Sequence, residues 1–386
     1  MIKHIKASNI LSFGPDGLDL ELKPLNVLIG ANGSGKSNFL EIISLIRSLP
    51  NDLQMTMSRG GGVNEWKWKG VDFLEDPFQG NCEIDFTFQH PHPIGKLLPP
   101  IDYEFEFNIG SNSVYFSKEI ISKPHYVESD LYAFSHHHRT LKGLPVNDKL
   151  FQQNASILSQ LKDPENHVEI TALGNELKKI KIYKNWNLGK NTIFRTPQPA
   201  DLRSDTLEED FSNLGLFLNN LKLKPNLKKQ ILHWLSYLYD NLTDFEIKVE
   251  GGAIQLYFIE GDFAIPASRL SDGSLRYLCL LAILLDPNPP GLICIEEPEL
   301  GLHPDILIKI ADLLVEASER TQLIITTHSD VIVDALTDSP ESVLVCEKYQ
   351  GRTNIHRLDT ENIKLWLEDY RLGELWSRGQ IGGNRW

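Results

Sequence analysis

Three short apolar runs along the chain do not alternate with polar residues. They are Asn26–Ile29, Leu292–Ile295 and Leu323–Ile325, and Gly, Pro, Thr or acidic residues bound them. A strand that is buried on both faces has no polar face, so it reads as a continuous apolar run. The three runs therefore predict strands of a mostly parallel sheet.

A second pattern, strict alternation, fills part of the interval between the first two runs. Glu83–Gln89 and Ile101–Ile109 place apolar residues on one face and mostly acidic or polar residues on the other. This period of two predicts half-buried antiparallel strands. Two further alternating runs, Phe245–Val249 and Ile254–Phe258, flank Gly251-Gly252 and predict a hairpin.

Between these sheets, apolar residues recur at spacings of three and four, which is typical of amphipathic helices. We therefore expect an α/β fold with three parts. The parts are an N-terminal lobe with antiparallel strands (residues 1–150), a helical insertion (151–244) and a C-terminal lobe (245–386).

Composition narrows the class of protein. The 386 residues include 38 Lys and Arg against 52 Asp and Glu, a net charge of −14, which argues against coating nucleic acid through bulk charge. The longest apolar run, Leu278–Leu285, is far shorter than the roughly 20 residues of a membrane span, and the N-terminus lacks the apolar core of a secretory signal. We expect a cytoplasmic protein that makes no membrane contact. The four widely spaced cysteines (Cys82, Cys279, Cys294, Cys346) suit reduced core thiols.

The first apolar run leads into Gly30-Ala-Asn-Gly-Ser-Gly-Lys-Ser37, which fits G-x-x-x-x-G-K-[ST] between a strand and an amphipathic helix. In such a loop the backbone N–H groups form an anion site at a helix N-terminus. Lys36 then reaches the β- and γ-phosphates and Ser37 offers its hydroxyl to Mg²⁺. The motif predicts binding of ATP and Mg²⁺ by Gly30, Asn32, Gly33, Ser34, Gly35, Lys36, Ser37 and Asn38.

The second and third apolar runs end in polar residues that suit phosphate chemistry. Carboxylates at the carboxyl end of a parallel strand, beside a phosphate loop, can hold Mg²⁺ and orient a water. We assign Glu296 to the metal and Glu297 to the attacking water as general base. His328 follows the third strand as a candidate γ-phosphate sensor. The alternatives are a solvated acidic loop and a structural histidine.

The order of these motifs resembles the ABC-type ATPases. Between the phosphate loop and the acidic strand stands Leu270-Ser-Asp-Gly-Ser274, which is similar to the signature motif of that family. The resemblance implies a head-to-tail homodimer, or a higher even oligomer, in which Ser271, Gly273 and Ser274 of one subunit close over ATP on the other. For Ser271, a simple helix N-cap is the alternative.

Within that superfamily the chain resembles the RecF/SMC/OLD-like branch, and in it the bacterial AAA-type predicted ATPases found in phage-defence gene pairs. The segments that carry this resemblance are Ile5–Gly14, Arg59–Gly62 with Trp66–Gly70, Glu296–Pro304, Leu372–Trp376 and Gly382–Trp386. It implies an ABC-ATPase head that gates a separately encoded effector, a nuclease or toxin, in antiviral defence. About forty residues follow the last expected core strand, Val343–Cys346, so we expect no TOPRIM nuclease domain.

Three finer expectations accompany the resemblance. Gln153 is the candidate for the glutamine that senses the metal, and Arg269 and Arg276 are candidate arginine fingers. Glu296 stands where most relatives of the wider superfamily have Asp.

Two alternative functions stay open. One is a RecF-like ATPase that binds DNA through lysines of the helical insertion; the other, less favoured, is the ATP-binding subunit of a transporter. The lysines are Lys178, Lys179, Lys181, Lys184, Lys222, Lys224, Lys228 and Lys229.

Overall fold

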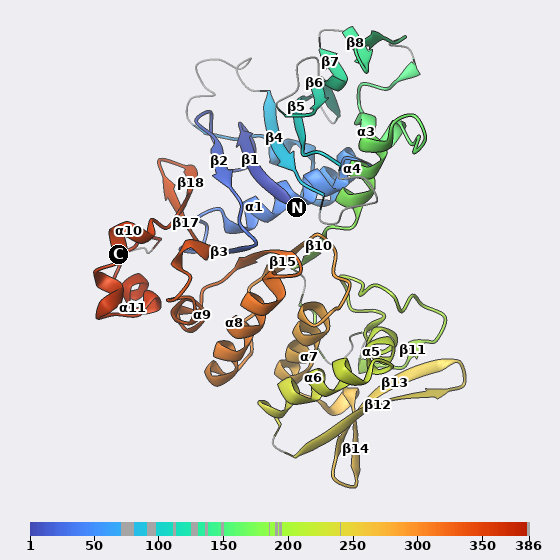
Figure 1. Ribbon diagram of the computed structural model, residues 1–386, viewed down its shortest axis with the longest axis vertical. Coiled ribbons are helices and arrows are strands. Elements are labelled where there is room, and N and C mark those ends of the chain that lie inside the picture. The colour runs from blue at the N-terminus through green and yellow to red at the C-terminus, as the bar shows by residue number, and fades with distance from the viewer. Residues whose placement is uncertain are drawn as a thin grey trace.

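A six-stranded core sheet crosses the middle of the computed structural model, with one lobe above it and another below (Figure 1). The structure describes residues 1–70, 81–90, 98–110, 113–124, 130–135, 138–147, 150–184, 186–189, 192, 195–239 and 241–383.

The core sheet has the strand order β10-β15-β16-β3-β17-β18. Its strands are β10 (Lys181–Tyr183), β15 (Leu292–Glu296), β16 (Gln322–Thr326), β3 (Leu25–Ile29), β17 (Val343–Tyr349) and β18 (Arg352–Arg357). All neighbours pair in parallel except β17 and β18. The prediction of three buried parallel strands is confirmed, since β15, β16 and β3 are adjacent.

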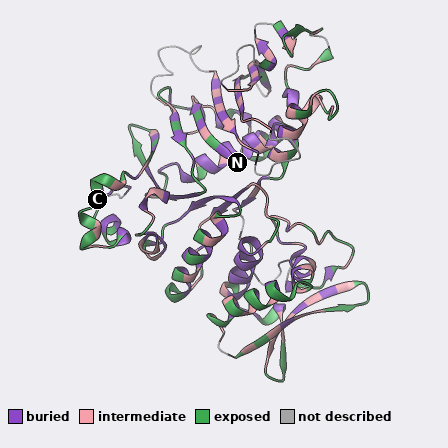
Figure 2. Ribbon diagram, in the orientation of Figure 1, coloured by how far each residue is buried: buried purple, intermediate pink, exposed green. Residues whose placement is uncertain are grey.

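Both faces of the core sheet are buried, as Figure 2 shows. Val27 and Ile29 of β3 point into a core with α7 (Asp272–Leu284) and α8 (Pro304–Ser318) below the sheet. Leu28 points into a second core with α1 (Lys36–Ser48) above it. This two-sided burial is the physical reason why the strand sequences do not alternate.

The upper lobe is built on an antiparallel sheet of eight strands. In spatial order they are β2 (Leu18–Glu21), β1 (Ile2–Ser8), β4 (Cys82–Phe88), β5 (Ile101–Ile109), β6 (Val114–Ser122), β7 (Asp130–Ser135), β8 (His138–Leu141) and β9 (Leu144–Pro145). β4 and β5 alternate between buried and half-buried residues, so their predicted amphipathic character is confirmed. Short helices α2 (Leu53–Arg59) and η1 (Val63–Trp66) follow α1.

The lower lobe contains a small antiparallel sheet. Its strands are β11 (Gln198–Pro199), β12 (Leu242–Glu250), β13 (Ala253–Glu260) and β14 (Phe263–Pro266), and the 3-10 turn η5 (Ala267–Arg269) follows. The predicted hairpin is confirmed: Val249 pairs with Ile254 across the Gly251-Gly252 turn, where both glycines have positive φ angles.

The interval 151–244, expected to be a helical insertion, is divided between the lobes. Its helices are α3 (Ile157–Gln160), α4 (Val168–Lys178), α5 (Leu214–Lys222) and α6 (Pro225–Ser236). It also contains β10, which is the edge strand of the core sheet. A strand of three residues is too short to interrupt the helical spacing on either side, so the sequence pattern did not reveal it. The boundaries of the three predicted parts remain predictions.

The last part of the chain packs beside the core sheet. It comprises α9 (Asp330–Ala335), η6 (Pro340–Ser342), α10 (Thr360–Ile363), η7 (Trp366–Glu368) and α11 (Leu372–Ser377), and α11 contacts α9. Cys82, Cys279, Cys294 and Cys346 are buried free thiols. Among the described residues, no helix combines the length and the apolar character that crossing a membrane requires.

Candidate functional site

The phosphate loop joins β3 to α1 at the carboxyl edge of the core sheet. Gly30 and Gly35 have φ angles of 151° and 109°, in a region that only glycine adopts without strain. A Cβ at Gly30 would overlap the carbonyl oxygen of Cys346, and one at Gly35 would overlap the side chain of Thr353. Helix α1 has neither a side-chain cap nor an acidic residue in its first turn, so its N-terminal N–H groups are left for an anion.

Lys36 lies inside this loop with its side chain folded back. Its Nζ donates to the carbonyl oxygens of Gly30, at 2.7 Å, and Ala31, at 3.1 Å. Burial lowers the pKa of Lys36, whereas the nearby carboxylates of Glu296 and Glu297 act to raise it. The Oγ of Ser34 is buried and has no hydrogen-bond partner in the structure. A buried ammonium and an unpaired hydroxyl in one loop fit a phosphate group.

Ser37 and Glu296 meet at the mouth of the loop. The Ser37 hydroxyl donates to Glu296 Oε1 over 2.5 Å, although 259 residues separate the two in the chain. A hydroxyl and a carboxylate are the oxygen ligands that Mg²⁺ takes beside a nucleotide. These two residues therefore fit the predicted metal.

Glu297 and His328 lie next to this pair. Glu297 has a φ of 47°, uncommon for a residue with a side chain, and its N–H donates to the carbonyl oxygen of Thr326 over 2.9 Å. Its Oε1 is 3.5 Å from Nε2 of His328. Burial, and secondly the charge of Lys36, lower the pKa of His328, which favours the neutral imidazole. The backbone N–H of His328 donates to Glu299 over 2.6 Å.

Residues missed by the sequence analysis support the loop from behind. Thr353 Oγ1 on β18 lies 2.9 Å from the carbonyl oxygen of Ser34 and 2.7 Å from Ser12 Oγ. Asn38, a predicted nucleotide contact, instead donates its amide to Ser12 Oγ at 2.7 Å. Asn32 and Gly33 are exposed at the outer turn of the loop. Only the fold reveals Ser12 and Thr353, because neither belongs to a recognisable motif.

Gln153 is not brought together with the other predicted metal ligands. Its carbonyl oxygen accepts the N–H of Phe116 on β6, and it lines a pocket on the antiparallel sheet whose described lining residues include none from the phosphate loop or β15. The structure therefore does not bring Gln153 together with Ser37 and Glu296, and its role as a metal ligand stays a prediction.

Trp186, which the sequence analysis did not single out, lies beside Glu296. It follows β10, whose last residue Tyr183 is in register with Ile295, so the chain leaves the core sheet beside Glu296. Trp186 Nε1 donates to the carbonyl oxygen of Glu296 over 2.7 Å. Recognition of β10 as a strand of the core sheet would have placed Trp186 next to Glu296.

Arg276, a candidate arginine finger, contacts the nucleotide site of its own chain. It is 6% exposed on α7, with its guanidinium carbon 4.7 Å from the ring centroid of Trp186, and it donates to the carbonyl oxygen of Glu297 over 3.2 Å. In this single chain Arg276 therefore contacts the backbone of Glu297, and its role as an arginine finger stays a prediction. Arg269 is exposed.

The signature-like segment Leu270–Ser274, here called the signature turn, lies at the N-terminus of α7. Ser271 is the N-cap: its Oγ accepts the N–H of Ser274 at 3.1 Å and lies 2.6 Å from that residue's hydroxyl. Arg195, 5% exposed, forms an ion pair with Asp272 and donates to the carbonyl oxygen of Leu270 over 2.6 Å. Ser271, Gly273 and Ser274 thus form a turn that is held by hydrogen bonds within the lower lobe.

Gly273 allows the signature turn to approach the segment after Glu297. A Cβ there would lie 2.7 Å from the carbonyl oxygen of Gly301. The N-terminus of α7 and the loop before α8 therefore pack as one surface.

The lysines expected to form a DNA-binding groove are mostly paired with acids and come from both lobes. The pairs, with N–O distances of 2.5 to 3.4 Å, are Lys179–Glu176, Lys181–Glu208, Lys184–Glu41, Lys222–Glu246 and Lys228–Asp244. Such pairs neutralise the local positive charge that phosphate binding requires. The structure does not favour the DNA-binding alternative.

Comparisons with known proteins agree with this geometry. The Retron Ec83 probable ATPase of Escherichia coli is 22% identical over 380 residues, which cover 85% of this chain and 68% of that protein. An SMC head bound to the C-winged helix domain of ScpA superposes with a TM-score of 0.57 at 14% identity, over 94% of this chain and 99% of that one.

A second SMC head, from Pyrococcus furiosus and bound to the C-terminal domain of ScpA, gives a TM-score of 0.55 at 13% identity, over 95% of this chain and 98% of that one. The predicted ABC-ATPase head fold is confirmed by these two structures. A family model described as "AAA domain, putative AbiEii toxin, Type IV TA system" matches residues 25–334. The chain belongs to this family of P-loop ATPases.

Proposed function

We propose that this chain hydrolyses ATP at the carboxyl edge of its core sheet. The observation that carries the proposal is the hydrogen bond of 2.5 Å between Ser37 and Glu296, which joins the phosphate loop to the acidic strand beside Lys36. Lys36 and the N–H groups at the start of α1 hold the β- and γ-phosphates. Mg²⁺, held by Ser37 and Glu296, neutralises charge on those phosphates when it is bound.

Glu297 and His328 act on the water that attacks the γ-phosphate. Glu297 accepts a proton from that water as general base, and the hydrogen bonds from Arg276 and to Thr326 hold its backbone in place. A neutral imidazole at His328, 3.5 Å from Glu297, can hydrogen-bond the water or a γ-phosphate oxygen, and unlike an imidazolium it does not weaken Glu297 as a base through an ion pair.

The signature turn acts on the nucleotide of a second copy of the chain. Ser271 is exposed at the N-terminus of a helix of 13 residues, where N–H groups and the helix dipole attract an anion. Leu300, in the adjoining loop, is 49% exposed and would be buried by a second copy. The likeness to SMC heads supports this arrangement at the level of the fold.

The dimer in turn gates a separately encoded effector in antiviral defence. The likeness to a retron ATPase supports this role. ATP brings two heads together and hydrolysis separates them. A partner that binds only the closed dimer, or only the separated heads, is therefore controlled by ATP hydrolysis.

The mass of the protein in solution with ATP and Mg²⁺ tests the proposal. Glu297→Gln keeps the phosphate loop but removes the base, so we expect it to bind ATP without hydrolysis and to form a dimer that dissociates when nucleotide is removed. Lys36→Ala is the matched control and should stay monomeric under the same conditions. A Glu297→Gln variant that hydrolyses ATP at the wild-type rate would contradict the assignment of the base, and a mass that ignores ATP would contradict nucleotide-driven dimerisation.

A further inference from the structure

The segment Leu372–Gly383, here called the strap, packs against two elements of the nucleotide site. It consists of α11 and the residues that follow, and it lies beside α9 and the core sheet (Figure 1). Leu372, Leu375 and Trp376 are at most 6% exposed, so the strap is anchored by apolar packing. Parts of the strap carry the family resemblance, but that resemblance implies no role for them.

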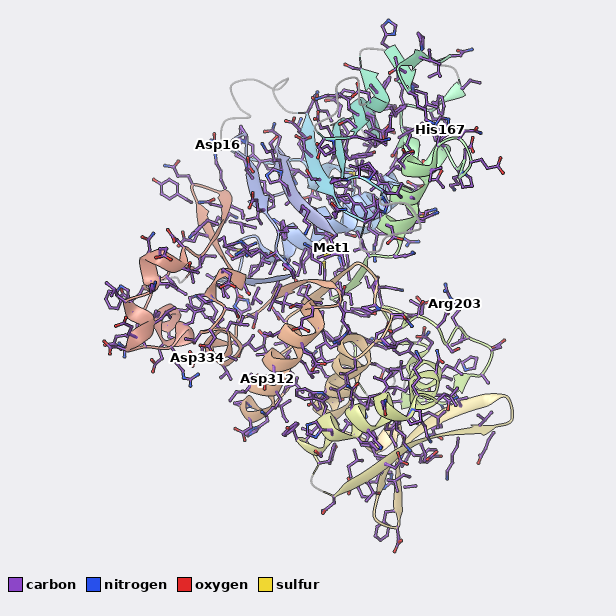
Figure 3. The ribbon with its side chains drawn as sticks, in the orientation of Figure 1. Met1, Asp16, His167, Arg203, Asp312 and Asp334 are labelled. Atoms are coloured by element: carbon purple, nitrogen blue, oxygen red, sulfur yellow. The ribbon has the colours of Figure 1, made fainter. Side chains whose placement is uncertain are left out.

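Its first end fixes α9, the helix that follows His328. The N–H of Gly373 donates to Oδ1 of Asp334 over 2.7 Å, and the N–H of Leu372 donates to Oγ1 of Thr337 over 3.1 Å. Asp334 is labelled on α9 in Figure 3. A Cβ at Gly373 would overlap the carbonyl oxygen of Asp330, so the two helices touch through their backbones.

Helix α9 begins two residues after His328. Its N-cap is Ser329, whose Oγ accepts the N–H of Ile332 over 3.3 Å and whose own N–H donates to Thr327. A shift of α9 would therefore move the backbone that carries His328 relative to Glu297.

The other end of the strap reaches the phosphate loop. The N–H of Gly383 donates to Oε1 of Glu347 on β17 over 3.0 Å. A Cβ at Gly383 would lie 3.4 Å from the Cα of Gly30 and 3.2 Å from Cγ1 of Val345. Gly30 thus lies close to both the carbonyl oxygen of Cys346 and Gly383.

We infer that the strap is a positioning element of the nucleotide site, which holds α9 and the start of the phosphate loop in one fixed relation. The inference rests on the proposed ATP hydrolysis. The contact of the strap with α9 is made through Asp334, and it affects turnover because it positions His328. The contact of the strap with Gly30 is supported by Glu347, and it affects ATP binding because it supports the phosphate loop.

The α9 contact is tested with Asp334→Ala and the conservative Asp334→Asn, which keeps a carbonyl oxygen to accept the Gly373 N–H. We expect Asp334→Ala to lower kcat about tenfold with KM for ATP within about twofold of wild type, since misplacing a catalytic group slows turnover more than binding. Asp334→Asn should restore most of kcat. Asp312→Ala, on the exposed face of α8, is the matched control and should leave both constants unchanged.

The Gly30 contact is tested with Glu347→Ala and Glu347→Gln. We expect Glu347→Ala to raise KM and the calorimetric Kd for ATP about fivefold with a smaller change in kcat, because the phosphate loop loses its support. Glu347→Gln, which can still accept the Gly383 N–H, should bind ATP like the wild type. Glu316→Ala on α8 serves as the control.

A strap that only stabilises the fold gives a different result. Both alanine variants would then unfold at lower temperature while kcat and KM of the folded protein stayed at wild-type values, and this outcome would overturn the inference. Failure of the wild type to hydrolyse ATP would contradict the proposed function itself. In that case the Kd of Glu347→Ala for ATP still decides whether the strap positions the loop.

Discussion

At the scale of residues, charge and burial act against each other in the site. Lys36 is 6% exposed, and its ammonium group is satisfied by two carbonyl oxygens of its own loop. A charge-assisted contact with a phosphate is stronger than a contact with a neutral carbonyl. Lys36 can therefore exchange loop oxygens for nucleotide oxygens without leaving its place.

His328 gives a prediction on pH. Its pKa is lowered from the ordinary value of 6.5, first by burial and then by the charge of Lys36. His328 is therefore protonated at a lower pH in the folded protein than in the unfolded chain. The free energy of unfolding should therefore fall as pH drops through 6.5 towards the folded pKa, and His328 should contribute nothing to this slope above that range. An NMR titration of the histidine ring protons, with the signal assigned through His328→Gln, should give a midpoint below 6.5.

The same titration in a Lys36→Ala background separates the two causes. Removal of the lysine charge should raise the His328 midpoint while burial still keeps it low. A wild-type midpoint at or above 6.5 would contradict the neutral imidazole that the proposed mechanism needs.

At the scale of elements, strand β18 supports the phosphate loop through Thr353. Thr353→Val keeps the shape of the side chain but removes the oxygen that lies within 2.9 Å of Ser34 and 2.7 Å of Ser12. The carbonyl oxygen of Ser34 and the hydroxyl of Ser12 each lose a buried partner, although Ser12 keeps the Asn38 amide. We expect a cost of about 1–3 kcal/mol in the free energy of unfolding and a several-fold weaker binding of ATP. Urea unfolding and calorimetry measure the two effects.

Thr56→Val is the control for that substitution. Its hydroxyl makes an exposed hydrogen bond of 3.4 Å within α2, so we expect little change in stability or binding. Equal effects from the two substitutions would show that β18 has no special role.

Strands and motifs with a strong local signal were predictable from sequence, whereas contacts between distant segments were not. The apolar residues of β3 predicted a buried strand, although the strand contains the polar Asn26. The structure explains how Asn26 can be buried there, since its amide donates to the carbonyl oxygens of Lys23 and Leu323. Trp186 could not be predicted, since its role depends on the three-residue strand β10 lying beside β15. The sequence could not place Gln153 relative to the site, because its distance along the chain from the antiparallel strands does not give the direction in which the chain leaves them.

At the scale of the whole molecule, the core sheet joins two separate cores. One contains α1 and the antiparallel sheet, and the other contains the signature helix α7. Arg276 links α7 to the backbone of Glu297 across the lower face of the core sheet. A change at the signature turn can therefore reach Glu297 in the same chain through one side chain.

The trans arrangement of the dimer predicts that two inactive variants complement each other. Lys36→Ala should be inactive because it cannot hold ATP, and Ser271→Arg because its signature turn is blocked. In a mixed dimer, the phosphate loop of the Ser271→Arg subunit faces the intact signature of the Lys36→Ala subunit, so one of the two sites is complete. Since one of the two sites in each mixed dimer is complete, the mixture should restore about a quarter of the wild-type ATPase rate if pairing is random, and up to about half if only mixed dimers form. The steady-state rate of phosphate release measures it, with each variant alone at the same total concentration as control. If the mixture stays as inactive as its components although mass measurements show mixed dimers, the signature turn acts within its own chain and the head-to-tail site is refuted.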